Sequence, residues 1–588
     1  MSASKPSFFA ELKRRNVHRA AVFYAASAWL LVQIATQVFP FYDVPNWMVR
    51  WVIAALVIGF PFAMTVSWFY EFTPKGFKRE RETVPAVAIS APSVSVVESA
   101  PTATAEASVA ILPFADFSAA MDQDYFCDGL SEDLITALSQ FAGLKVISRD
   151  SSFQFRDRKD GSATIGQKLG VANLLEGSVR RAGDVVRISA TLVKAADGST
   201  LWSQHYDRAY KDLFALQDDI TQAVASALQA RLLPTTSAAI QNTRPPSGNL
   251  DAYNAWLQGN FYSARSTEDD IRRAIGDYDR AIALDPLYAQ AYASRSLALT
   301  DLGSSYLSGE TATDTYIHAR SNARRALSLA PDLLDAHLVL GQLLVVADFD
   351  LESAEIAYRK AGTLAPDAAG PKLHLGGILG QLGHLEEGAE QLRQALQLDP
   401  LSSRTHRALA DIELAMGRLD AAEQSIRKAI ALQPDAATNY RTLVYIDVCR
   451  GDMAAALRDA QQEPAVQYRV VEVMMALHVG GDRGKADAVL AQLIAEYGDY
   501  VSFQIAGAYA LRKDPDQAFA WLDRGWAARD PGICKLLLDP FLLAYKDDPR
   551  FAAFCRKVGL PAPGAAVPSA TGSTASPAST SAATVGKQ

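Results

Sequence analysis

The sequence Ala-Glu-Ile-Ala-Tyr-Arg-Lys-Ala-Gly-Thr-Leu-Ala-Pro, residues 354–366, contains the pattern that decides the fold of most of this chain. Ala354, Tyr358 and Ala361 share one face of a helix, because residues four and seven positions apart lie above one another in a helix. Pro366 ends that helix, since proline has no amide hydrogen to donate to the preceding turn. The stretch predicts a helix whose small-residue face lets a second helix approach closely.

The pattern repeats through the second half of the chain, and its closing proline marks the period. The prolines are Pro286, Pro331, Pro366, Pro400 and Pro434. They are spaced by 45, 35, 34 and 34 residues, and the first interval contains an insertion around residues 306–315. A 34-residue period of this kind resembles the tetratricopeptide repeat, in which each unit is a pair of antiparallel helices. The resemblance implies a superhelix with a concave groove that binds protein or peptide segments.

We expect this all-α superhelix to occupy residues 249–560. Beyond Pro434 the pattern weakens, although small and apolar residues still suggest a sixth unit and two more, so the number of repeats there stays open. Terminal repeats are expected to be atypical because one of their faces meets solvent. The remaining residues, 561–588, are rich in Pro, Ala, Ser and Thr and are predicted to be disordered.

The repeat register also predicts which side chains line the groove. Groove positions lie on the first helix of each pair, away from the packing residues. By that register the groove residues are Gln342, Arg404, Arg407, Asp411 and Arg441. Three arginines among them suggest a ligand with acidic side chains or a C-terminal carboxylate. The alternative is that these side chains are ordinary solvated surface.

At the other end of the chain, two runs have no charged residue. Residues 20–39 and 51–70 are each about as long as a helix that crosses a bilayer, and only the short turn 40–46 separates them. A two-helix transmembrane hairpin over residues 20–70 is therefore expected, with the lipid bilayer as its partner. A signal peptide or a buried helix pair is the alternative, disfavoured because a second full-length run follows the first at once.

Basic residues flank the predicted hairpin on both sides. Lys and Arg occur in the leader, residues 1–19, and in the segment that follows, residues 71–105, whereas the turn has none. This asymmetry predicts a two-pass protein of the bacterial inner membrane, with its N-terminus and soluble domains in the cytoplasm. Residues 8–17 and 71–76 resemble a two-helix membrane module found at the front of many bacterial tetratricopeptide proteins. The basic residues could also bind anionic lipid headgroups, and residues 84–104 predict a flexible tether.

Between the tether and the repeats, residues 106–234 alternate strand-like and helix-like patterns. The predicted strands are 108–114, 144–148, 173–180 and 185–193, and the predicted helices are 124–141, 164–169 and 212–233. The last two strands flank a good hairpin turn at Gly183. This order predicts a small α/β domain with one mixed sheet and helices packed on it.

Four phrases in this block, residues 109–114, 128–134, 175–180 and 201–208, resemble the TolB amino-terminal domain. In bacteria that domain commonly stands between a membrane or regulatory module and tetratricopeptide repeats. The resemblance covers roughly Ala107–Leu233. It implies a sensing or docking role rather than catalysis.

Residues typical of catalysis or metal binding are missing from the sequence. Residues 161–168 imitate a phosphate loop, but Gln167 separates the glycine from the lysine and no buried strand precedes them. Asp128, Glu132 and Asp133 are interpreted as acids near a helix start. The four cysteines have no metal-ligand spacing, which indicates free thiols in a reducing compartment. We therefore expect no catalytic, cofactor-binding or metal-binding residue, and no cofactor.

The net charge of −8 and the pI near 5.6 argue against a nucleic-acid surface, which would need clustered cations. The fold class expected is a multidomain chain of membrane hairpin, α/β domain and helical repeats. The leading interpretation is a membrane-anchored, non-catalytic scaffold that binds protein partners. The alternative is a regulatory or sensory component of bacterial signalling, related to membrane-linked cyclases or transcription regulators but without its own catalytic domain, because the leader is too short to hold either domain. The partner, the signal and the oligomeric state stay open.

Overall fold

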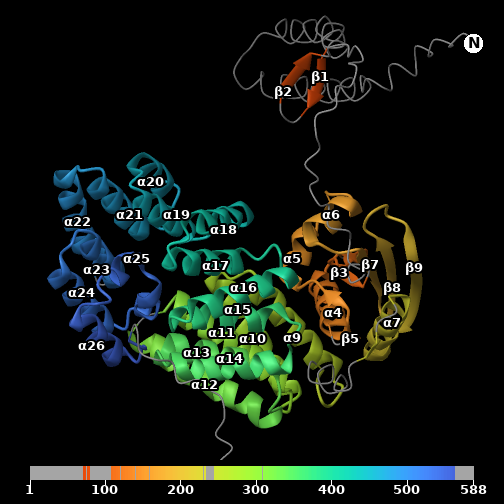
Figure 1. Ribbon diagram of the computed structural model, residues 1–588. Helices are drawn as coiled ribbons and strands as arrows, with labels where there is room; N and C mark the ends of the chain where they lie inside the picture. The colour runs from red at the N-terminus through yellow and green to blue at the C-terminus, as the bar shows by residue number, and fades with distance from the viewer. Residues whose placement is uncertain are drawn as a thin grey trace, which may run out of the picture. The chain divides into compact units, whose positions relative to one another are not determined.

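The structure is a computed structural model, and it describes residues 70–73, 76–79, 107–118, 121–139, 141–157, 159–228, 231–232, 244–307, 309–498 and 500–562. The chain divides into two compact units, Met1–Glu98 and Ser99–Gln588. Each unit is described by itself below. Figure 1 shows the element labels used from here on.

The first unit contains one described feature, a pair of short strands. Strand β1 (Tyr70–Thr73) pairs antiparallel with β2 (Gly76–Arg79), so that Tyr70 lies opposite Arg79. This pairing falls at the end of the predicted hairpin and in the juxtamembrane segment, before the tether expected at residues 84–104. Two residues of sequence separate the two strands, the spacing that is common in hairpins.

The prediction of a two-pass inner-membrane protein is corrected by the structure. In the parts of the chain that the structure describes, no helix combines the length and the apolar character needed to cross a bilayer. The predicted hairpin, residues 20–70, itself lies outside the described residues except for Tyr70. The fold class is accordingly a small mixed-sheet domain followed by an all-helical repeat region.

The second unit begins with the mixed sheet. Its strands are β3 (Ser108–Ile111), β4 (Ala115–Asp116), β6 (Lys145–Val146), β7 (Asn173–Ala182), β8 (Val185–Lys194) and β9 (Thr200–Ala209). The order is β6-β3-β7-β8-β9, and β4 also pairs with β7. Strands β6, β3, β4 and β7 run parallel, whereas β7, β8 and β9 are antiparallel. Two further short strands, β5 (Phe141–Ala142) and β10 (Arg231–Leu232), pair with each other.

Helices cover both faces of this sheet. Val109 and Ile111 of β3 face the same core as α4 (Asp124–Leu138) and α7 (Leu213–Ala227), whereas Ala110 faces the core that contains α6 (Ser162–Leu169). All four residues of β3 are buried. A strand buried on both faces reads as a continuous apolar run, and this explains why residues 108–114 lack polar alternation. Short helices α5 (Arg149–Ser152), η2 (Phe153–Phe155) and η3 (Tyr210–Asp212) complete the domain.

The repeat region contains eight successive helix pairs among the described residues. They are α9 (Leu250–Ser263) with α10 (Glu268–Leu284), α11 (Ala289–Ser305) with α12 (Gly309–Leu329), α13 (Leu334–Leu343) with α14 (Leu351–Leu364), α15 (Ala369–Gln381) with α16 (Leu385–Leu398), α17 (Ser403–Ala415) with α18 (Leu419–Leu432), α19 (Asn439–Arg450) with α20 (Met453–Ala460), α21 (Val466–Val479) with α22 (Arg483–Tyr497), and α23 (Ser502–Leu511) with α24 (Pro515–Ala527). The insertion predicted after Tyr306 lengthens α12 to 21 residues.

Glycines on first helices explain how each pair packs so closely. A Cβ built on Gly259 would lie 2.4 Å from Tyr278, and one on Gly341 would lie 2.4 Å from Tyr358. Both tyrosines are buried, so their rings occupy the space that a larger residue would need. The recurring tyrosine of the motif thus packs on a glycine of the partner helix, which is the physical reason for the small residues in the pattern.

After the last pair the chain forms a C-terminal cap. It consists of the 3-10 helix η5 (Pro531–Leu538), α25 (Pro540–Leu543) and α26 (Pro549–Val558). Residues 563–588, where disorder is predicted, lie outside the described residues. The first helices of neighbouring repeats contact one another along the array, as α15 does with α17 and α17 with α19.

The α/β domain and the first repeats share one hydrophobic core. A single cluster of buried residues includes Leu134 of α4, Ile220 of α7, Trp256 of α9 and Tyr288 before α11. A Cβ on Gly129 of α4 would lie 2.4 Å from the Leu257 side chain on α9. The small domain and the repeats are therefore parts of one packed unit.

Candidate functional site

The candidate site is a cluster of charged side chains on first helices in the middle of the array. Asp411 of α17 lies 3.7 Å, oxygen to nitrogen, from both Arg441 of α19 and Lys535 of η5. The Thr442 hydroxyl donates a hydrogen bond of 2.7 Å to the other Asp411 oxygen. One turn before Asp411, Arg407 donates to the Thr438 hydroxyl at 2.7 Å. Three cations thus surround one carboxylate.

The electrostatics of this cluster follow from burial and charge. Burial would raise the pKa of Asp411, but Lys535, Arg441 and Arg407 together hold it below its ordinary value. Burial, reinforced by Arg441, lowers the pKa of Lys535 to about 8. A carboxylate with an excess of cations around it stays ionised at neutral pH. A lysine beside other cations, in contrast, loses its proton more easily.

Two buried acids nearby contribute less charge than their number suggests. Burial raises the pKa of Glu472 well above its ordinary value, and the neighbouring Glu463 raises it further. Burial also raises the pKa of Asp539 to about 6, even though its carboxylate accepts backbone hydrogen bonds from Phe541 and Leu542. Burial therefore disfavours the charged form of both acids. Around Asp411 itself, three cations face one carboxylate.

The free space at the cluster is small. The cavity lined by Asp411, Arg441, Lys535 and Asp539 has a volume of about 20 Å³. That volume suits about one water molecule and is too small for a peptide side chain. The cover is η5, which contacts both α15 and α17.

The structure brings some of the predicted groove residues together and separates others. All five lie on first helices: Gln342 on α13, Arg404, Arg407 and Asp411 on α17, and Arg441 on α19. Arg407, Asp411 and Arg441 form the cluster just described. Gln342 instead donates a hydrogen bond of 2.9 Å to Asp301 on α11.

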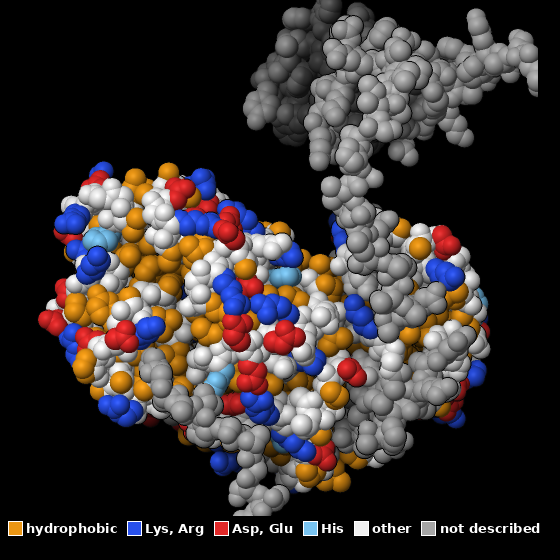
Figure 2. Space-filling view, viewed as in Figure 1, with side chains coloured by type: hydrophobic (Ala, Val, Ile, Leu, Met, Phe, Trp, Pro, Cys, Tyr) orange, Lys and Arg blue, Asp and Glu red, His pale blue; other side chains and the backbone are white. Residues whose placement is uncertain are grey.

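The three arginines predicted to line the groove differ in exposure. The Arg441 side chain is only 12% exposed and is held by Asp411, while Arg407 is half-buried and Arg404 is exposed. On the face seen in Figure 2, basic and acidic side chains are interspersed over the repeats rather than gathered by sign. Sequence reasoning also missed Lys535, because η5 lies outside the 34-residue period and no register applies to it.

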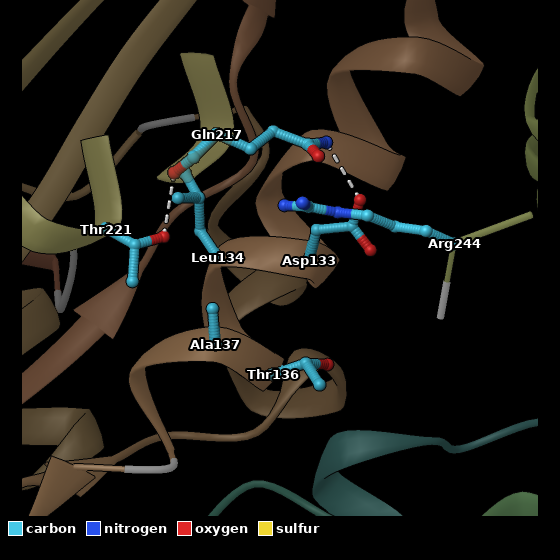
Figure 3. A pocket seen from close by; sticks show the side chains of 7 residues that line it. All are labelled: Asp133, Leu134, Thr136, Ala137, Gln217, Thr221 and Arg244. Atoms are coloured by element: carbon cyan, nitrogen blue, oxygen red, sulfur yellow. Dashed lines mark hydrogen bonds between the residues drawn. The ribbon is translucent and has the colours of Figure 1, made fainter. Parts of the chain in front are cut away.

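A second polar cluster lies where the α/β domain meets the first repeat. Asp133 of α4 accepts hydrogen bonds from Gln217 of α7, at 2.9 Å, and from the Tyr253 hydroxyl of α9. Gln217 also donates to that hydroxyl at 3.0 Å. Figure 3 shows Asp133 and Gln217 converging beside Arg244, and the cavity there is about 10 Å³. Burial raises the pKa of Asp133 to about 7.

This second cluster ties helices together and leaves no room for a substrate. Asp128, on the same helix, is held by Arg156 at 2.6 Å and 2.7 Å. The interpretation of Asp128 and Asp133 as helix-start acids is corrected, because α4 begins at Asp124 and both residues lie beyond its first turn. Each instead accepts a side-chain donor from another segment. Among the described residues, no group of three or more His, Cys, Asp or Glu side chains is arranged to hold a metal ion.

The α/β domain also reaches the middle of the array. Ser151 of α5 donates to the Asp399 carboxylate, and the Leu401 amide donates to Ser151 at 2.9 Å. Gln154 donates to the Leu401 carbonyl at 2.8 Å. These contacts place α5 and η2 against the loop between α16 and α17 (Figure 1). The small domain thus bridges the first repeat and the fourth.

The fold and this site define a helical-repeat protein with a mixed α/β domain packed on its first repeats. Residues 379–444 match the model of the tetratricopeptide repeat, so the predicted repeats are confirmed. Residues 105–223 match the model of the second domain of HilA/YgeH-like transcriptional regulators. The comparisons do not support the expected TolB-like domain or the two-helix membrane module.

One curated relative is named "putative adenylate cyclase 3", from Rhizobium meliloti (strain 1021). It is 36% identical over 248 residues, which make up 40% of this chain and 39% of the relative. The chain therefore spans about two fifths of the length of that protein.

Solved structures with similarity include PilF of Pseudomonas aeruginosa, at 22% identity and a TM-score of 0.29, covering 36% of this chain and 94% of that one. A tetratricopeptide repeat protein of Thermus thermophilus shows 22% identity and a TM-score of 0.28, covering 36% of this chain and 98% of that one. Both similarities concern the repeat fold, and no function is taken from them.

Proposed function

We propose that this protein is a scaffold that binds protein or peptide segments through the concave face of its repeats. The observation that carries the proposal is the exposed Arg404 beside the positively charged cluster on α17. Burial raises the pKa of Asp301, and Arg404 lies close enough to that carboxyl to oppose the rise. Because Gln342 already binds Asp301, the Arg404 guanidinium keeps donors for another acceptor.

An acidic segment is the ligand that fits this position. Its carboxylate would meet the planar guanidinium of Arg404, which suits two parallel hydrogen bonds. Behind it, the cations around Asp411 add a positive potential that does not require direct contact. An exposed ion pair contributes only about 0.2–1 kcal/mol, so recognition depends on several contacts and weakens with salt.

The α/β domain has a positioning role in this proposal. Its contacts through Asp133 and Tyr253, and through Ser151 and Asp399, hold it against both the first repeat and the loop before α17. Binding near Arg404 therefore occurs a few residues from the Asp399 contact. We infer that the scaffold presents the small domain and the bound segment in a fixed relation.

A second candidate function is regulation in a bacterial signalling system. Two observations favour it: the match of residues 105–223 to a transcriptional-regulator domain, and the relative whose printed name is an adenylate cyclase. For this regulatory function, the ligand of the same concave face is a signalling protein. The purified chain can be assayed for conversion of ATP to cyclic AMP. Both the scaffold and the regulatory function predict no product. Formation of cyclic AMP would contradict both.

The direct test of the scaffold proposal is peptide selection. We expect the purified chain to enrich peptides with clustered Asp and Glu from a random display library. Arg404→Ala should reduce that enrichment, whereas Lys428→Ala, an exposed position on the second helix α18, should leave it unchanged. Equal enrichment with Arg404→Ala and with the wild-type chain would contradict the proposed site.

A further inference from the structure

The C-terminal cap inserts one short helix against the concave face. Helix η5, residues Pro531–Leu538, contacts α25 of the cap, α24 of the eighth pair, and also α15 and α17 of the middle repeats. It is an eight-residue 3-10 helix, although such helices seldom exceed three or four residues. In a 3-10 helix, side chains three positions apart lie above one another. The segment therefore has distinct faces.

One face of η5 is directed at the groove. Lys535 lies 3.7 Å from the Asp411 carboxylate, and Leu538, three residues later, packs with the apolar cluster that contains Ile412. A Cβ placed on Gly380 of α15 would lie 3.5 Å from Leu538. The groove thus offers a carboxylate for an amine and, one 3-10 turn away, an apolar site for a leucine.

The opposite face of η5 is anchored in the cap. Ile533 and Leu536, again three positions apart, are buried in an apolar cluster that extends from the C-terminal helices to α15 and α17. Ile533 lies 3.4 Å from a Cβ placed on Gly525 of α24, and the backbone at Gly532 lies against Phe503 of α23. Through Ile533 and Gly532, η5 thus also packs on the eighth helix pair.

A second contact sets the position of the cap. Arg529, just before η5, donates to the Ala347 carbonyl, and its guanidinium lies 4.8 Å from the centre of the Phe349 ring. Trp526 packs on the same ring at 5.9 Å. Ala347 belongs to η4 (Leu344–Asp348), a π-helical turn, and such turns leave carbonyl groups outside the regular ladder. The cap thus reaches from the eighth repeat to the third, with η5 between.

The ion pair that η5 makes with the groove contributes little to stability. The Lys535 side chain is 33% exposed, and the Arg441 cation lies near it. A cavity remains beside it, and on the groove side Gly383 meets Leu537 without a side chain of its own. The groove contacts described here involve one lysine and two leucines, which a segment with the same groups can reproduce.

We propose that the part of the concave face formed by α15 and α17 is a binding surface for a protein segment that presents a lysine and a leucine one 3-10 turn apart, with η5 as the chain's own occupant. This inference rests on the proposed function only in treating the concave face as the binding face. It names a second section of that face, adjacent to Arg404, with different ligand chemistry. A partner segment would bind by displacing the Lys535 and Leu538 face of η5.

The test uses the full chain and a fluorescent peptide that copies residues 529–541, with Cys534 replaced by Ser. The open variant is Lys535→Ala combined with Leu538→Ala. We expect it to bind the peptide at least about tenfold more tightly than the wild-type chain, by fluorescence anisotropy. A control peptide in which the residues copied from Lys535 and Leu538 are both replaced by Ala should not bind, and adding Asp411→Asn to the open variant should weaken binding.

Equal peptide affinity of the wild-type chain and the open variant, with the melting temperature of the variant near that of the wild type, would overturn the proposal. If the double variant has a lower melting temperature than the wild type, Lys535→Ala alone replaces it. We then expect a smaller gain in peptide affinity, about threefold. No gain in affinity would count against the proposal. A wild-type dimer that the peptide dissociates would overturn the assignment of η5 as an occupant within one chain. The binding test with peptide 529–541 does not depend on Arg404. A negative result therefore leaves the acidic-peptide selection at Arg404 unaffected, and the two proposals can fail independently.

Discussion

The first repeat and the middle repeats are covered by different parts of the chain, and the two covers differ in how they are held. On α9 the cover is α4 of the small domain, which shares a continuous apolar core with the repeat and has Asp133 bonded to Tyr253. On α15 and α17 the cover is η5, held by Lys535 and Leu538. Both covers share an apolar cluster with the repeats beneath them, but α4 adds a buried hydrogen bond whereas η5 adds a partly exposed ion pair.

This difference teaches where a partner can bind. Displacing α4 would expose a fully buried tyrosine and strand a carboxyl group that has lost its hydrogen bonds, which is costly in an apolar setting. Displacing the groove face of η5 exposes two leucines, Leu537 and Leu538, and separates one ion pair of 3.7 Å. A repeat array can therefore use the same concave surface for permanent docking at one end and for exchangeable binding further along.

The largest effect should come from the permanent cover. Tyr253 is completely buried, with its ring against Phe214 at 5.1 Å and its hydroxyl at Asp133. Tyr253→Ala should lower the free energy of unfolding by about 3–5 kcal/mol, because it leaves a cavity and breaks the tie between α4 and α9. Urea unfolding measures this loss. Tyr500→Ala, at a side chain that is 77% exposed, is the matched control and should change stability by less than about 0.5 kcal/mol.

A smaller loss should follow from overfilling the middle repeats, the frame on which the exchangeable cover lies. Ala429 of α18 is completely buried, and the Ser403 hydroxyl of α17 donates to its carbonyl at 3.0 Å. Ala429→Trp should lower the free energy of unfolding by about 1–3 kcal/mol, since the helices cannot separate without losing contact elsewhere. The thermal melt of the full chain reports it. An unchanged melt would mean that the helix register described here is wrong.

The permanent cover should also respond to pH, and the sign follows from Asp133. Its pKa is about 7 in the folded chain against an ordinary value of 3.8, so the folded state binds the proton more tightly than the unfolded state. Its contribution is most favourable below the ordinary value and is lost as the pH rises towards the folded value. Asp133→Asn keeps the side-chain shape and removes the titration.

The difference in unfolding free energy between the wild-type chain and Asp133→Asn should therefore shift against the wild type between about pH 4 and about pH 7, and stay constant above that range. Denaturant unfolding at a series of pH values across this range measures the shift. A difference that moves in the opposite direction would show that Asp133 is ionised in the folded chain and that the tie has another origin.

The smallest effect should come from the exchangeable cover. Lys535→Ala removes a partly exposed ion pair, so it should change the free energy of unfolding by no more than about 1 kcal/mol. The control is Leu536→Ala, on the cap-facing side of the same helix, which should cost about 2–5 kcal/mol because Leu536 is completely buried. Similar losses for both would mean that η5 is an ordinary part of the core, and the contrast between the two covers would disappear.

The sequence predicts the elements of this fold better than their docking. Ala354, Tyr358 and Pro366 predict a helix pair because the repeat period is local and recurs. The hairpin around Gly183 follows from the turn, and Gly183 adopts the left-handed φ of 60° that such a turn needs. Strand β9 was not predicted, because its residues are mostly exposed and show no apolar alternation.

The candidate site was only partly predictable. The 34-residue register places Arg407 and Arg441 on neighbouring first helices, as the structure does, but it gives no information on what covers them. Lys535 comes from a 3-10 helix outside the repeats, and Asp133 meets Tyr253 across 120 residues. Such contacts depend on how separately patterned segments pack, which periodicity along one segment does not encode. The membrane prediction depended on length and charge alone.

Hydrogen exchange of the full chain, with and without saturating peptide 529–541, tests the central claim most directly. The account predicts that the peptide increases exchange in residues 531–538 while the amides of α4 and α9 keep their protection, since only the cover on α15 and α17 is exchangeable. Unchanged protection in residues 531–538 under saturating peptide, or a loss of protection in α4 and α9 together with η5, would contradict it.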